Sequence, residues 1–269
     1  LYYKYVSFLR FQGRNDEAII FLEKSCFPKF PKCHKFYIQR GQIYHKLGKL
    51  DESRESYSIG TKKLPHCAVL WVLLAKVDEI DFNKPTKARS ELDIAVRKNP
   101  DEELLYLAKV HMEKRLGNYD QARLIVFQSL QKFPKSPSLW AENIRLLATK
   151  RASLKRSMFQ DALKNSNNSC EVLIEIGLSF FQESQYSTAL KWFERATKTN
   201  PLNGDAWVFL TRCLKRLKKD LDFCYVQVKE HEPMYGAEWI SISKNIEFQY
   251  CSSSEILIIL TREKDAAPL

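Results

Sequence analysis

Bulky side chains recur along this chain about every 34 residues, with small side chains beside them. The residue four positions before each bulky one and the residue three positions after it are mostly small, as at Ser53 and Gly60 around Tyr57. Spacings of four and three place all three positions on one face of a helix. The bulky positions are Tyr57, Leu92, Val126, Phe193 and Tyr225. The pattern predicts one closely packed helix in each period.

Prolines keep the same register as these helices. Successive prolines lie 34, 35, 34, 67 and 32 residues apart, and 67 is close to two periods. Proline lacks a backbone N–H and clashes with the preceding turn, so it ends a helix. One proline per period therefore predicts one helical hairpin per period. The prolines are Pro31, Pro65, Pro100, Pro134, Pro201 and Pro233.

Glycine marks the turn inside several hairpins. Gly48 and Gly117 each lie 17 residues before a proline, and Gly13 begins the same signal near the start of the chain. Glycine takes the left-handed conformation at a helix end without strain. We expect Asp51 and Asp120, which follow these turns, to cap the next helix.

Some units depart from this pattern. The third is expected to use a loop over 81–86 in place of the glycine turn, and the fifth a polar connection over 165–169. The seventh has no glycine turn, only the basic run 215–219. A last repeat helix is predicted over 235–249. Terminal units of a repeat array are commonly atypical because they form its caps.

A helix-turn-helix period of this length resembles the tetratricopeptide repeat (TPR). Tryptophans near the starts of first helices resemble the half-a-TPR (HAT) variant, and we expect them to pack between helices instead of stacking on bases. They are Trp71, Trp140, Trp207 and Trp239. We predict an all-α, right-handed α-solenoid of about seven and a half units over 1–250, with a capping helix or tail over 251–269.

The composition gives the chain a net positive charge and excludes some classes of protein. The chain has 43 basic and 32 acidic residues, a net charge of +11 that favours RNA, acidic protein faces or anionic membranes without choosing among them. Its apolar run Ile256–Leu260 is far shorter than the about 20 residues of a membrane-spanning helix. Seven cysteines without a C-x-x-C pair indicate reduced thiols in the cytosol or nucleus. The chain begins at Leu1, and we expect a piece of a longer protein.

The sequence offers no catalytic constellation. It lacks phosphate-cradling glycine motifs, the H-E-x-x-H zinc motif and the G-x-S-x-G nucleophile elbow. The spacing of Cys26, Cys33 and His34, with His66 and Cys67 one period later, does not match a zinc site. We therefore predict a protein that is not an enzyme, with no metal and no cofactor.

Basic residues instead suggest an interaction surface. In a TPR solenoid the first helices line the concave face, and seven basic residues map there as a candidate groove for phosphate or acidic peptides. An ordinary solvated face is the alternative. The seven are Lys35, His45, Lys46, His111, Lys114, Arg115 and Arg145. Separate basic runs occur at Lys150-Arg151 with Lys155-Arg156, and over 215–219.

The second half of the chain is similar to the C-terminal end of the pre-mRNA-splicing factor 6 family. The similar segments are 157–164, 189–193, 204–207, 232–239 and 243–244, read as SMFQDALK, ALKWF, GDAW, EPMYGAEW and SK.

This resemblance implies a nuclear, non-catalytic scaffold that bridges U5 and U4/U6 snRNP components in the tri-snRNP and the spliceosome. Its partners would be spliceosomal snRNP proteins, with no small-molecule substrate and no membrane. A solenoid that binds RNA directly through the basic groove and a generic TPR adaptor for peptides remain the alternatives.

Overall fold

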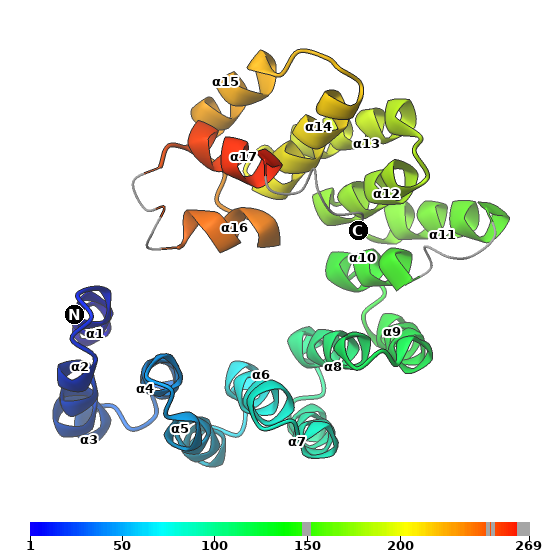
Figure 1. Cartoon of the computed structure of the whole chain (residues 1–269). Coiled ribbons are helices and arrows are strands. Elements are labelled where there is room, and N and C mark those ends of the chain that lie inside the picture. The colour runs from blue at the N-terminus through cyan, green and yellow to red at the C-terminus, as the bar shows by residue number, and fades with distance from the viewer. Residues whose placement is uncertain (147–151, 246–247, 249–250, 263–269) are drawn as a thin grey trace. The chain divides into compact units, whose positions relative to one another are not determined.

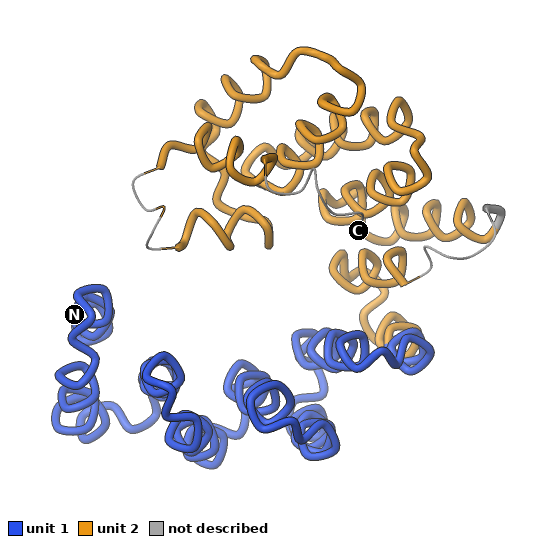
Figure 2. The backbone as a smooth tube through the Cα atoms, in the orientation of Figure 1, with its two compact units in different colours: residues 1–125 blue, residues 126–269 orange. Residues whose placement is uncertain are grey.

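The computed structural model describes residues 1–146, 152–245, 248 and 251–262, and the chain forms two compact units, Leu1–Ile125 and Val126–Leu269 (Figure 2). The described residues form helices, apart from turns, loops and one isolated β-bridge between Asn203 and Tyr235. The predicted all-α class is therefore confirmed.

In unit 1 helical hairpins follow one another along the chain. The first helices α4, α6 and α8 line one side of this unit, and the second helices α5 and α7 line the other (Figure 1). A π-helical turn, η1, lies between α2 and α3, and a second, η2, ends α6. The elements are α1 (Tyr2–Phe11), α2 (Asn15–Phe21), η1 (Leu22–Cys26), α3 (Phe27–Lys29), α4 (His34–Lys46), α5 (Leu50–Lys63), α6 (Ala68–Lys76), η2 (Val77–Asp81), α7 (Pro85–Lys98) and α8 (Glu103–Arg115).

Helix α9 (Tyr119–Lys132) runs across the division between the units. Unit 2 continues the hairpins as α10 (Pro137–Leu146), α11 (Ala152–Asn165), α12 (Cys170–Gln182), α13 (Tyr186–Thr199), α14 (Gly204–Arg216), α15 (Asp222–His231), α16 (Ala237–Ser243) and α17 (Ser253–Arg262).

The periodic prolines and the aromatic residues of the first helices are joined by a recurring hydrogen bond. The indole Nε1 of Trp207 donates to the carbonyl oxygen of Pro201, six residues earlier, at 2.8 Å. A carbonyl left free where a helix has ended thus finds a donor. The same bond occurs at Tyr37–Pro31, Trp71–Pro65, Tyr106–Pro100, Trp140–Pro134 and Trp239–Pro233. The tryptophans are therefore structural, as the sequence predicts.

The glycine turns are confirmed, but the aspartate caps are not. Gly48 and Gly117 have φ values of 73° and 76°. Where glycine is missing, Lys218 takes the same left-handed conformation. The N-cap of α5 is Lys49, which makes no side-chain capping bond, and Asp51 lies inside the first turn. There its charge complements the helix dipole instead of capping a single N–H.

The final hairpins differ from the sequence prediction. Helix α16 covers Ala237–Ser243 and so begins later and ends earlier than the predicted 235–249, of which 246–247 and 249 lie outside the described residues. The helix cannot begin earlier because the backbone of Tyr235 is hydrogen-bonded to a distant part of the chain. The Tyr235 N–H donates to the Leu202 oxygen, and the Tyr235 oxygen accepts from the Gly204 N–H. Gly236 then takes a φ of 109° that suits glycine.

The GDAW and EPMYGAEW segments meet in this region. The Asp205 carboxylate accepts the backbone N–H groups of Trp239 and Glu238 at 2.8 and 3.4 Å, which caps α16. A Cβ at Gly204 would lie 2.2 Å from the Trp239 ring, so only glycine allows this approach. These segments therefore hold α16 against α14.

Packing within each unit is local. Tyr37, Tyr57 and Leu70 form one cluster of unit 1, and Ile144, Ala162 and Val172 form one cluster of unit 2. Such clusters between neighbouring hairpins are typical of repeat proteins.

Helix α17 lies within the region predicted as a cap. It buries Ile256, Leu257 and Leu260 in the cluster that contains α14 and α15 residues. The division into 1–250 and 251–269 stays a prediction, and 263–269 lie outside the described residues. Among the described helices, none combines the length and apolarity that crossing a membrane requires.

Candidate functional site

The first-helix side of unit 1 contains two adjoining hollows. The larger has a volume of about 280 Å³ and lies between α4 and the end of α6. Its lining combines apolar side chains with a histidine, a lysine and an aspartate. The residues are Gln42, His45, Tyr57, Leu73, Lys76, Val77, Ile80 and Asp81.

The second hollow, of about 180 Å³, lies between α6 and α8. It shares Lys76 with the first, so this lysine stands between the two. Lys76 is exposed and makes no ion pair within the described part of the chain. The lining is Val72, Ala75, Lys76, Glu79, Leu92, Ala108, His111, Met112 and Arg115.

The π-helical turn η2 positions the rims of both hollows. It carries Ile80 and Asp81 to the first hollow and Glu79 to the second. Ile80 is 50% exposed although it is apolar. Single π-helical turns inside α-helices occur frequently at functional sites.

Two of the predicted site residues pair with carboxylates at these rims. His45 Nε2 lies 3.0 Å from Asp81 Oδ2. Arg115 donates two parallel hydrogen bonds to Glu79, at 2.8 and 2.6 Å. Hydrogen bonding to Glu79 raises the pKa of the Arg115 guanidinium. The positive charge expected of these residues is therefore largely balanced locally.

Not all of the other predicted residues of unit 1 line the hollows. His111 lines the second hollow beside Arg115, and Lys114 is half-buried on the same helix. Lys46 is exposed at the end of α4. Lys35 lies at the other end of α4, with its Nζ 5.4 Å from the centre of the Tyr3 ring. The hollows thus include His45, His111 and Arg115 but not the three lysines.

Arg145 belongs to unit 2, where it lies on α10. It pairs with Glu142 on the same helix and with Glu175 on α12. Both carboxylates are almost fully buried. This arginine therefore joins two first helices of unit 2.

Sequence reasoning missed a repeated ion pair in unit 1. Arg54 Nε donates to Asp78 at 2.7 Å, and Arg89 Nε donates to Glu113 at 2.6 Å. Each pair joins a second helix to the first helix of the next hairpin. The two arginines are 35 residues apart in the sequence, and so are their two carboxylate partners. The signal that could have revealed them is this shared period of an arginine and a carboxylate.

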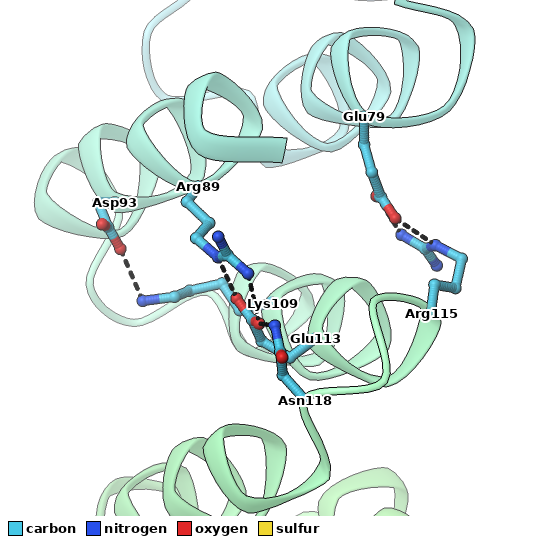
Figure 3. A network of polar contacts seen from close by, with 7 residues as sticks. All are labelled: Glu79, Arg89, Asp93, Lys109, Glu113, Arg115 and Asn118. Atoms are coloured by element: carbon cyan, nitrogen blue, oxygen red, sulfur yellow. Dashed lines mark hydrogen bonds and ion pairs between the residues drawn. The ribbon is translucent and has the colours of Figure 1, made fainter. Parts of the chain in front are cut away.

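Figure 3 shows the polar network around Glu113. Arg89 holds both carboxylate oxygens, and the Asn118 amide donates to one of them at 2.8 Å. Lys109 on the same helix pairs with Asp93 at 2.7 Å. Hydrogen bonding from Arg89 lowers the pKa of Glu113.

One lysine of each predicted basic run contacts another part of unit 2. Lys155 pairs with Glu183 at 2.5 Å, and Lys215 donates to the backbone oxygen of Thr261 at 3.2 Å. Lys150 and Arg151 lie outside the described residues. Lys155 therefore joins α11 to the end of α12, and Lys215 joins α14 to α17.

Both hollows combine apolar walls with a few charged groups at the rim. Such a combination is typical of binding sites. Within the described residues no group of three His, Cys, Asp or Glu side chains is placed to hold a metal ion.

Comparison with known proteins agrees with this architecture. The tetratricopeptide repeat profile matches residues 34–58. The crystal structure of a tetratricopeptide repeat protein from Parabacteroides merdae superposes with a TM-score of 0.50 and 17% identity, covering 78% of this chain and 81% of that one. This likeness supports the fold, a helical repeat solenoid.

Two curated relatives extend over most of the chain. Pre-mRNA-splicing factor 6 of Saccharomyces cerevisiae is 52% identical over 98% of this chain, and Pre-mRNA-splicing factor prp1 of Schizosaccharomyces pombe is 30% identical over 85% of it. The matched regions span 30% and 25% of the lengths of these relatives. The profile of the PRP6, TPR-like domain matches residues 99–260, more than half of the chain. The chain therefore belongs to the PRP6 TPR-like domain family.

Proposed function

We propose that this chain is a non-catalytic scaffold in pre-mRNA splicing, acting in the nucleus. In this role it bridges U5 and U4/U6 snRNP components during assembly of the tri-snRNP and the spliceosome, through contacts with their proteins. The observation that carries the proposal is the 52% identity to a splicing factor over 98% of the chain.

The first-helix side of unit 1 is the proposed contact surface. Its two hollows accept apolar side chains, while Lys76 between them and His45, His111 and Arg115 at their rims meet polar groups of the partner. Lys35, Lys46, Lys114 and, in unit 2, Arg145 belong to the wider proposed surface. Repeat arrays suit such a role because they expose long surfaces to several partners.

Direct RNA binding is the competing proposal, since the net charge is +11. The ion pairs of Arg115 and Arg145 with carboxylates count against it, because RNA phosphates would have to displace those partners. Protein contacts are therefore the preferred mode.

Affinity purification of the tagged chain from nuclear extract, with and without nuclease, tests the proposal. We expect U5 and U4/U6 snRNP proteins to remain bound after nuclease. A Lys76→Glu, Ile80→Asp double variant should lose them, while Lys62→Glu, an exposed lysine on the second-helix side, should not. Loss of all splicing proteins on nuclease treatment would favour direct RNA binding instead.

A further inference from the structure

A third hollow lies in unit 2, on α14 between α13 and α15, and has a volume of about 540 Å³. Short connections make successive helices antiparallel, so α13 and α15 run in the same direction on either side of α14. This volume lies within the about 300–1,000 Å³ typical of ligand pockets. The lining is Glu194, Thr197, Lys198, Pro201, Trp207, Leu210, Phe223, Gln227 and His231.

Aromatic side chains dominate this hollow. The Trp207 ring lies 6.4 Å from the Phe223 ring and 6.3 Å from the His231 ring, measured between centroids. Trp207 is only 3% exposed, whereas Phe223 is 62% exposed in the first turn of α15. Phe223 therefore forms an apolar wall that nothing in unit 2 covers within the described residues.

The polar groups distinguish the two ends of the hollow. Lys198 lies near the end of α13, and His231 is the last residue of α15. His231 Nδ1 donates to the Gln227 backbone oxygen at 2.9 Å, so Nε2 of the uncharged ring is an acceptor. Glu194 lies one helical turn before Lys198. Lys198 is thus the group of the hollow that attracts a carboxylate.

We propose that this hollow is a docking site for an amphipathic helix of a protein partner. The helix inserts apolar side chains against Trp207, Leu210 and Phe223. A carboxylate in its first turn, where it also stabilises the helix itself, lies over Lys198. The inference concerns a surface outside unit 1 and does not rest on the proposed role in splicing.

Two other occupants fit the geometry less well. A proline-rich segment docks in a groove lined by accessible aromatic rings, but the Trp207 ring is covered and its Nε1 already donates to Pro201. A nucleic-acid base can stack on the exposed Phe223 ring, but a single-strand site also needs a positively charged groove along the backbone, and this lining holds one lysine, Lys198, beside Glu194. The apolar volume with one cationic end favours a helix with an acidic first turn.

The test uses the whole chain and a labelled, lactam-bridged peptide of three helical turns. This probe carries leucines at i, i+4 and i+7 and two aspartates in its first turn. Fluorescence anisotropy measures its affinity beside that of two control peptides, one with lysines in place of the aspartates and one with a central proline. We expect the aspartate peptide to bind and the proline peptide to bind at least about tenfold more weakly.

Variants of the chain locate the binding. Phe223→Glu should weaken the aspartate peptide about tenfold, and Lys198→Glu should reverse the preference between the aspartate and lysine peptides. Val226→Glu, which places the same charge on an equally exposed apolar position of α15 outside the hollow, should stay within about twofold of the parent. Circular dichroism melting verifies that each variant is folded.

Several results would overturn the proposal. These are no binding of the aspartate peptide, equal binding of the proline peptide, or equal losses with Phe223→Glu and Val226→Glu. Two further measurements identify other occupants. Binding of a labelled RNA oligonucleotide that Phe223→Glu alone abolishes would assign the hollow to RNA. Self-association in sedimentation that the same variant abolishes would assign it to a second copy of the chain.

Discussion

The ring of Phe193 occupies the space that a side chain at Gly177 would need. A Cβ at Gly177 would lie 2.5 Å from Phe193 Cε1, closer than any ordinary contact. Gly41 and Tyr57 repeat this relationship in unit 1, where the corresponding distance is 2.3 Å. In both pairs the glycine lies on the first helix and the aromatic residue on the second helix of one hairpin. Glycine at these positions therefore allows the two helices of each hairpin to approach closely.

The substitution Gly177→Ala should lower the free energy of unfolding by about 1–3 kcal/mol, because the added methyl group overpacks a buried contact. Urea unfolding followed by circular dichroism measures the loss. Gln182→Ala, at an exposed position of the same helix, should stay within about 0.5 kcal/mol of the parent. A double-mutant cycle with Phe193→Leu should show coupling, and strict additivity would contradict the steric explanation.

Removing Arg89 should destabilise unit 1 more than removing an exposed ion pair. Arg89→Ala leaves the buried Glu113 carboxylate with only Asn118, and we expect a loss of about 1–3 kcal/mol in urea unfolding. Lys109→Ala is the control, because its partner Asp93 is half-exposed and such pairs contribute about 0–1 kcal/mol. Equal losses of unfolding free energy for the two substitutions would show that the burial of Glu113 does not increase the contribution of its ion pair to stability.

The same pair has a defined pH dependence. Arg89 lowers the pKa of Glu113 in the folded chain. Its stabilisation is therefore present above the pKa of an unfolded glutamate and is lost as the pH falls through the lowered folded value. The gap in unfolding free energy between the parent and Arg89→Ala should narrow in acid, and a constant gap would contradict this linkage.

Glu91 should give stability the opposite dependence on pH. Burial, together with the neighbouring Asp78 carboxylate, raises the pKa of Glu91 from its ordinary value near 4.5 to about 8, against the opposing effect of Arg54. Within the described part of the chain, Asp78 Oδ2 and Glu91 Oε2 are both buried and have no hydrogen-bond partner, so a proton shared between them would satisfy both. Lys87 Nζ lies 3.3 Å from Asp78 and 4.0 Å from Glu91.

A group whose folded pKa is raised stabilises the fold fully below its unfolded pKa, and this stabilisation is lost as the pH rises through the folded pKa. The parent chain should therefore lose stability between about pH 4.5 and 8. Glu91→Gln should remove that slope in urea titrations across the range. Parallel slopes for the parent and the variant would mean that Glu91 is ionised in the folded chain.

The cysteines should divide into two kinetic classes. Cys33, Cys67 and Cys251 are half-buried, whereas the other four are buried. Burial raises the pKa of Cys170 to about 12 and that of Cys213 to about 11, which suppresses the reactive thiolate. With Ellman's reagent at pH 8 we expect three fast thiols and four that react only on unfolding. A chain with serine at the three half-buried positions should lose the fast phase, and rapid reaction of Cys170 would contradict its burial.

Much of the fold could be predicted from the sequence because local rules determine it. The prolines and the glycine turns each act within a few residues, and the bulky side chains of Tyr57, Leu92, Val126 and Phe193 are buried as their register predicts. The start of α16 was less accessible, because it depends on Asp205 and Leu202, more than 30 residues earlier in the chain.

The candidate site was predicted less well, since charge counts do not reveal partners. Arg115 and Arg145 look like free cations in the sequence, yet each is held by carboxylates of other helices. The hollows depend on where η2 begins, and no local signal around Val77 distinguishes a π-helical turn from an α-helical one. For the same reason, the position of Lys76 between the two hollows could not be predicted.

The repeated ion pairs Arg54–Asp78 and Arg89–Glu113 have a consequence for how unit 1 comes apart. Each pair connects one hairpin to the next, so fraying of a single hairpin would strand a carboxylate in an apolar interface. Repeat arrays with weak interfaces melt stepwise from their ends, whereas strong interfaces link neighbours into one transition. The part of unit 1 from α4 to α8 should therefore melt as a single cooperative block, with few partly unravelled molecules available to proteases or to aggregation.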